Sequence, residues 1–285
     1  MPGMSGRKNR AAKLYPMILP SASPITEILS VAVALAYTVP AAAAARMSAP
    51  AARAWLMLGW LLHALVLGWG LLGDTPRFGF APALSMTAWL VLTMYGVESH
   101  LFPQLPVRWA LAALGGIAVL LPLAFPGAHL HAASPWLPLH LALGIASYGL
   151  FAAAVLHAWL MTRAERQIRL ASDARTGVPL LTLERLTFRF VTVGFILLSA
   201  TLLAGWFFAE TLYGPTGTGP GWQWDHKTVF SILSWLTFAV LLLGRARFGW
   251  RGRKAVRFLY AGSGLLLLAY VGSRFVLEVI LGRTP

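Results

Sequence analysis

The sequence contains no cysteine and few charged residues. The absence of cysteine among its 285 residues excludes disulfide bonds and thiol chemistry on this chain. Only 11% of the residues are charged, and just 9 are acidic. No Walker loop, G-x-S-x-G elbow or H-E-x-x-H motif occurs, which argues against the common nucleotide hydrolases, serine hydrolases and zinc proteases. We expect a protein that is not an enzyme.

Apolar residues dominate what is present. They make up 58% of the chain, and the mean hydropathy is +0.69. Runs of about 20 such residues match the thickness of a bilayer core, where the backbone must form helices to satisfy its polar groups. The sequence therefore predicts an all-α, polytopic integral membrane protein with about eight transmembrane helices in one bundle. The expected spans are residues 28–45, 54–72, 80–97, 109–125, 139–161, 190–208, 224–243 and 256–281.

The basic residues predict an orientation. A net charge of +14 would suggest nucleic acid in a soluble protein, but here the basic residues cluster between apolar runs, so we predict no nucleic-acid partner. Six arginines lie in the expected loop 162–189, and five arginines and a lysine lie between residues 245 and 257. Basic loops stay in the cytoplasm. Eight spans then place both termini and the segment GWQWDHKT (residues 221–228) on the outer side.

The first residues conflict with this orientation. The segment MPGMSGRKNRAAK carries four basic residues, which favour the cytoplasm, whereas eight spans place it outside. The tail either crosses at some cost, or translation begins at Met17, which we favour. We accordingly expect a short basic tail at residues 1–24, which need not belong to the native protein, and a single transmembrane domain at residues 25–285.

One histidine lies in the middle of an apolar run. His63, in WLLHALVLGWG, is expected roughly ten residues from each membrane face. An ionisable group at that depth is costly and is a functional hypothesis by default. The alternative is a neutral imidazole hydrogen-bonded to a neighbouring helix.

Two further histidines begin expected helices on the outer side. His140 opens the fifth span and His226 opens the seventh. Imidazole is a common haem-iron ligand, and two histidines on facing helix ends would give six-coordinate iron. A pair of interfacial polar residues is the alternative. His100 and His157, near the inner ends of their spans, are interpreted as packing or interface residues.

The aromatic residues of GWQWDHKT adjoin a carboxylate. Trp222 and Trp224 immediately precede Asp225 and follow a glycine-rich stretch. Tryptophan is enriched at membrane interfaces in any case, but this density suits a planar amphipathic ligand. Asp225 might instead only cap the seventh helix. Near the outer end of the last span, Arg274 could pair with Glu278 or meet an acidic ligand group.

Together these segments resemble a known family. A tryptophan-rich segment ending in Trp-Asp before a helix, preceded by a histidine in LHLALGIASYGLF, is similar to the cytochrome c assembly family. The segments DHKTVFSILSW, GWRGR and YVGSRFV resemble its HemX/YpjD branch. The resemblance implies non-covalent haem as cofactor. It matches His140 to an outer haem ligand, Trp222, Trp224 and Asp225 to a shortened tryptophan-rich motif, and His63 to an intramembrane ligand.

The chain also departs from the family pattern. The tryptophan-rich motif is short, a second outer histidine is replaced near Arg274, and a later intramembrane histidine is lost near Arg245. We hypothesise that His226 stands in for the missing outer ligand.

These observations lead to one expected function and one alternative. The first is haem handling or delivery at the outer face of the bacterial inner membrane. Its expected partners are the lipid bilayer, other maturation proteins and apocytochrome c. The alternative is a regulatory or accessory membrane protein, in tetrapyrrole synthesis or ion transport, with reduced haem handling.

Overall fold

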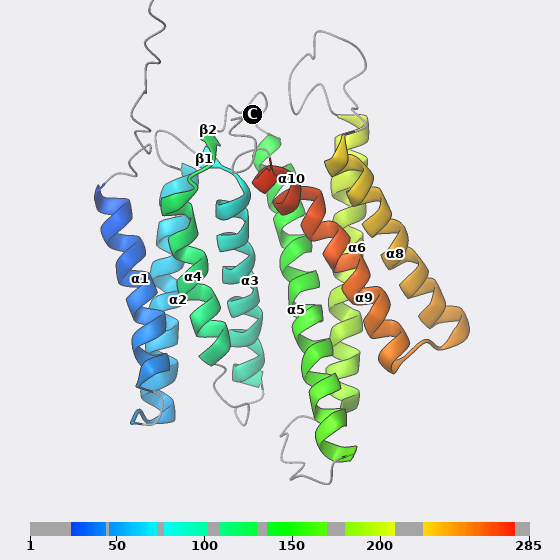
Figure 1. The fold of residues 1–285 in the computed structure, drawn as a ribbon, viewed down its shortest axis with the longest axis horizontal. Helices are drawn as coiled ribbons and strands as arrows, with labels where there is room; N and C mark the ends of the chain where they lie inside the picture. The colour runs from blue at the N-terminus through cyan, green and yellow to red at the C-terminus, as the bar shows by residue number, and fades with distance from the viewer. Residues whose placement is uncertain are drawn as a thin grey trace, which may run out of the picture.

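The computed structural model is almost entirely helical (Figure 1). It describes residues 24–43, 46–72, 77–101, 109–129, 136–169, 180–208 and 225–276. The helices are α1 (Pro24–Ala42), α2 (Ala49–Leu72), α3 (Phe80–Leu101), α4 (Trp109–Ala124), α5 (Leu137–Arg169), α6 (Leu180–Phe207), α8 (His226–Phe248), α9 (Gly252–Leu267) and α10 (Ser273–Phe275). A π-helical segment, η1 (Leu268–Gly272), joins the last two. The prediction of an all-α polytopic membrane protein is confirmed.

The number of spans is less certain than the class. Within the described residues, six helices are long and apolar enough to cross a membrane: α2, α3, α5, α6, α8 and the continuous rod from α9 into η1. The apolar parts of α1 and α4 are shorter, covering Pro24–Val39 and Leu111–Ala124. Eight crossings therefore stay a prediction.

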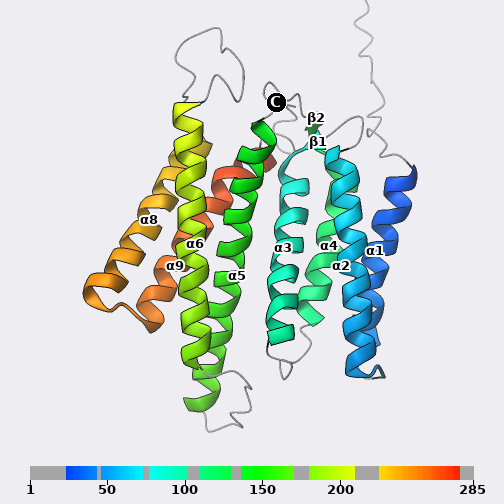
Figure 2. The same ribbon diagram turned by 180° about the vertical axis from the view of Figure 1, so that it is seen from behind.

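The helices form two groups that are visible from both sides (Figures 1 and 2). In the first, α1 packs on α2 and α4, and α3 packs on α4. In the second, α5 packs on α6 and α9, and α8 packs on α9. Each group has its own buried core, one around Tyr37 and Val119 and the other around Phe151 and Phe238. Helix α3 connects the groups through its contacts with α5 and η1.

Two helices extend beyond the predicted spans. Helix α5 continues past residue 161 to Arg169, and α6 begins at Leu180 rather than at residue 190. The expected loop 162–189 is therefore largely helical at both ends, which corrects the prediction. Hydropathy marks where a chain leaves the bilayer, but a helix continues into water when its residues favour helix, as arginine, glutamate and leucine do.

A small sheet covers one end of the first group. Strands β1 (Arg77–Phe78) and β2 (Ala128–His129) pair antiparallel, with Phe78 opposite Ala128. Gly127 precedes β2 at φ 78°, and a Cβ there would lie 2.5 Å from the carbonyl oxygen of Phe78. Only glycine permits this approach. We call this end of the molecule the sheet end.

The opposite end carries the two arginine-rich segments, and we call it the arginine end. The turn between α8 and α9 lies there, as does the C-terminal part of α5 (Figure 1). Glu184 of α6 holds this turn in place, with its Oε1 2.8 Å from Nη1 of Arg245 and 3.2 Å from Nε of Arg251. Both basic segments therefore lie at one end, as the predicted orientation requires.

Candidate functional site

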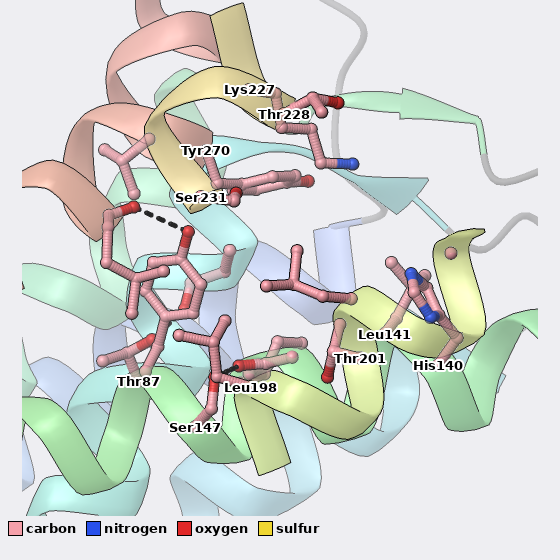
Figure 3. Close-up of a pocket in the computed structure, with 18 of the residues that line it drawn as sticks. Thr87, His140, Leu141, Ser147, Leu198, Thr201, Lys227, Thr228, Ser231 and Tyr270 are labelled. Carbon is pink, nitrogen blue, oxygen red and sulfur yellow. Dashed lines mark hydrogen bonds between the residues drawn. The ribbon is translucent and has the colours of Figure 1, made fainter. Parts of the chain in front are cut away.

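A cavity of about 370 Å³ lies near the sheet end, between the two groups of helices (Figure 3). Residues of β1, α3, α5, α6, α8, α9 and η1 line it. Its volume is in the range of small-molecule sites. Most of its walls are apolar, with Leu141 and Ile145 from α5 and Leu198 and Leu202 from α6. It contains three ionisable groups of interest: His140, Asp225 and Lys227.

His140 lies in the first turn of α5. Its backbone N–H donates to the carbonyl of Trp136 at 3.0 Å, which anchors the start of the helix. The side chain is buried, with 9% of the residue exposed, and it lines the cavity (Figure 3). A buried imidazole facing an apolar cavity is a suitable ligand for haem iron or a hydrogen-bonding group for a polar ligand atom.

Asp225 determines how α8 enters the site. Its side-chain Oδ1 accepts a hydrogen bond from the backbone N–H of Thr228 at 2.8 Å, and its own backbone is extended. This is an N-cap, so the predicted capping contact of Asp225 is present, and Asp225 also lines the cavity. The helix that follows turns Lys227 and Thr228 into the cavity lining, whereas His226 is exposed and is not among the lining residues.

The structure therefore does not place His140 and His226 on one cavity. Their surroundings differ, with His140 buried in the lining and His226 exposed at the start of α8. An iron bracketed by this pair needs both rings on the same space, and we do not carry the pairing forward. Trp222 and Trp224 lie outside the described residues. Arg274 is in α10, and its side chain is outside the described part of the structure.

Tyr270 is a lining residue that the sequence did not single out. It belongs to η1, the π-helical segment that interrupts the last helix beside the cavity. Its ring lies 5.7 Å from the ring of Phe78 in β1, and Nζ of Lys227 lies 5.7 Å from its centroid. Tyr270 thus contacts both groups of helices. Isolated π turns are frequent at functional sites, but no sequence pattern marks this one.

Four of the cavity hydroxyls donate to backbone carbonyls. Tyr148 donates to the carbonyl of Leu266 at 2.7 Å, and Ser147 donates to that of Gly144 at 2.7 Å. Thr87 and Thr201 each donate at 2.8 Å to the carbonyl four residues earlier. These hydroxyls stabilise the helices that form the walls.

His63 lies away from this cavity, in the first group of helices. It is fully buried, its Nε2 is 2.9 Å from Oγ of Ser85, and its Nδ1 is 3.4 Å from the hydroxyl of Tyr37. These contacts match the alternative of an imidazole hydrogen-bonded to neighbouring helices. A role as an intramembrane haem ligand stays a prediction.

A buried carboxylate–imidazole pair was not recognised in the sequence. Nε2 of His157 lies 2.6 Å from Oε1 of Glu98, where α5 meets α3. Glu98 is one of only nine acidic residues and lies at the end of an apolar span, a signal that deserved the same weight as His63. His157 also contacts the carbonyl of Ala153 at 2.7 Å.

The residues of the cavity fit a haem with one protein ligand. Apolar walls suit the porphyrin, His140 supplies one imidazole, and Lys227 supplies a cation for an acidic substituent. Within the described part of the chain, no group of three histidine, cysteine, aspartate or glutamate side chains is arranged to hold a metal ion.

Comparison with known proteins identifies the family of this chain. Residues 49–281 match the model of the cytochrome c assembly protein family. The inner membrane protein YpjD of Escherichia coli K12 is 31% identical over 200 residues, which cover 69% of this chain and 73% of YpjD. The cytochrome c biogenesis protein CcsA of Prochlorococcus marinus MIT 9515 is 34% identical over 94 residues, covering 33% of this chain and 28% of CcsA. No solved structure matches.

The family match spans every helix from α2 onward and includes the whole lining of the cavity. The chain belongs to the cytochrome c assembly protein family.

Proposed function

We propose that the protein binds haem non-covalently in the sheet-end cavity and handles it at the outer face of the bacterial inner membrane during cytochrome c assembly. The observation that supports this most is the joint presence of a buried imidazole, His140, and an ammonium group, Lys227, on one apolar cavity. Relatives in this family are named cytochrome c biogenesis proteins, and YpjD is named an inner membrane protein.

The residues of this chain would divide the work. His140, in the first turn of α5, would ligate the iron, and the leucine and isoleucine side chains of α5 and α6 would surround the porphyrin and exclude water from it. Haem itself supplies the iron that His140 ligates. Nothing in the site resembles a nucleophile with an adjacent general base, so we propose a binding and delivery protein rather than an enzyme. Apocytochrome c and other maturation proteins are the proposed partners.

The test is a haem titration of the purified protein in detergent, followed by absorption spectroscopy. The wild type should give a saturable Soret shift and sharp bands on reduction. His140→Ala should weaken binding or convert the spectrum to one lacking that ligand. His100→Ala is the matched control, because His100 is an exposed histidine in the last turn of α3. Equal behaviour of the two variants would contradict the proposal.

A second candidate is an accessory membrane protein with reduced haem handling. Two observations favour it. The similarity to YpjD covers about twice as much of this chain as the similarity to CcsA. At the position where the resemblance implies a lost intramembrane histidine, Arg245 is committed to an ion pair with Glu184 and stacks 3.5 Å from the ring centroid of Phe188. A wild type that is colourless when prepared from haem-replete cells and does not titrate with haem would favour this candidate.

A further inference from the structure

Lys227 is the only lysine or arginine among the described residues that line the cavity. We propose that it is a carboxylate-binding residue, and that the cavity takes an amphipathic acid whose apolar body lies between α5 and α6 and whose acidic group meets Lys227. This deepens the proposed function, because the acidic groups of haem are its two propionates. A long-chain fatty acid offers the same chemistry from the membrane.

The position of Lys227 supports this assignment. It is in the first turn of α8, next to Asp225 and His226, which are exposed, so it lies at the rim of the cavity rather than in its depth. Its aliphatic stem is half-buried, and Nζ lies 5.7 Å from the centroid of the Tyr270 ring (Figure 3). A lysine packed over an aromatic ring loses less freedom on binding than one in open solvent.

Four of the other donors at the site are already used. Tyr148, Ser147, Thr87 and Thr201 direct their hydroxyl protons at backbone carbonyls. The backbone N–H of Thr228, which a helix N-terminus would otherwise offer to an anion, donates to Asp225. An acidic ligand that enters this apolar space meets Lys227 as the one lysine or arginine among the described lining residues, and a charge-assisted contact is strong where water is partly excluded.

The apolar walls and the single cation also define the orientation of the ligand. Leu141, Ile145 and Leu198 are among the apolar residues that line the space, where an ionised group would pay a large desolvation cost. The acid must therefore face the rim, and the apolar body must face the helices. A neutral ester of the same ligand would keep the apolar contacts and lose the contact with Lys227.

The experiment compares four probes on the full chain in detergent: haemin, haemin dimethyl ester, metal-free protoporphyrin IX, and a fluorescent long-chain fatty acid. Lys227→Gln should weaken haemin and protoporphyrin binding by about tenfold or more and leave the dimethyl ester within about twofold. Lys227→Arg should retain the affinity for the acids. His140→Ala should affect haemin and its ester but not protoporphyrin, because only the first two carry iron.

Lys254→Gln is the matched control, since Lys254 also lies over an aromatic ring, 3.8 Å from the centroid of Trp250, but at the arginine end. It should change no affinity. Thermal unfolding of each variant checks that the fold is kept.

The outcomes separate this inference from the proposed function. If Lys227→Gln weakens the acid and the ester equally, Lys227 acts through the shape of the cavity and the inference is overturned. If the wild type binds no haemin but binds protoporphyrin or the fatty acid through Lys227, the haem function fails and the carboxylate site stands. If haemin binds but the affinity for no acid depends on Lys227, the haem function stands and the carboxylate site fails.

Discussion

Nε2 of His157 and Oε1 of Glu98 lie 2.6 Å apart in the interface between α5 and α3. Both residues are almost completely buried, at 2% and 6% exposed. Because α3 makes the main contacts between the two groups of helices, this polar pair lies in the junction that holds the bundle together.

We expect that removing one partner of this pair destabilises the protein strongly. Glu98→Leu or His157→Leu leaves the other group buried without its partner, which typically costs about 3–5 kcal/mol. The double variant should be more stable than either single variant, because it buries no orphaned group. Thermal and denaturant unfolding in detergent measure this, with His100→Leu as the neighbouring exposed control. Additive losses in the double variant would contradict the pairing.

The His63 contacts lead to a second prediction. His63→Leu should leave the Ser85 and Tyr37 hydroxyls without the imidazole and lower the free energy of unfolding by about 1–3 kcal/mol. His63→Gln should lose less, because the amide can still hydrogen-bond to Ser85. The haem content of folded His63→Gln then tests the ligand role: a loss would support it, and an unchanged content would end it.

The cap of α8 is testable on its own. Asp225→Ala removes the acceptor for the Thr228 N–H and should cost about 0.5–2 kcal/mol of stability. Asp225→Asn should be nearly neutral, since asparagine caps a helix about as well. Because Lys227 is placed by this first turn, Asp225→Ala should also weaken the binding of acidic probes, whereas Asp225→Asn should not. A defect in Asp225→Asn as large as that in Asp225→Ala would mean that the charge of Asp225, and not its cap, matters.

The predicted orientation places the arginine end in the cytoplasm and the sheet end on the outer side of the membrane, and reporter fusions can test both. Reporter fusions after Thr176 and after Gly252 should read cytoplasmic, because both sites adjoin the arginine clusters. A fusion after Gly219, before α8 begins at the other end, should read external. An external signal from either arginine-rich site would reverse the orientation and with it the proposed face for haem handling.

Much of the fold was predictable, because the apolar runs are long and the charged residues are few. The helix ends were not. Helix α6 begins ten residues before the predicted span, because Glu184 and Arg185 are good helix formers outside the bilayer too. Glu184 also pairs with Arg245, which keeps this first part of the helix in place. Hydropathy predicts where the chain enters and leaves the bilayer, whereas helix propensity and local contacts determine where the helix begins and ends.

The site was partly predictable. His140 and Asp225 were identified from the resemblance, and the structure places both on the cavity. The hypothesis for His226 placed it beside the ligand, but its neighbour Lys227 lines the cavity instead, because adjacent helical residues point about 100° apart. Because Asp225 caps α8, it determines at which residue the helix begins and so which side chains of the first turn face the cavity. The contact between Glu98 and His157 is separated by 59 positions, and no local pattern relates them.

The π-helical segment η1 has a consequence for comparing this chain with its relatives. A π turn uses an i→i+5 hydrogen bond, so the last helix holds one residue more than a regular α-helix would need for the same path. The apolar stripe that runs through α9 is therefore out of phase with α10 by about 100°. An alignment that extends the stripe through the bulge would assign Phe275 to the wrong face. A relative with one residue fewer between Leu267 and Ser273 would have a regular helix here, and Tyr270 would no longer be presented to the cavity.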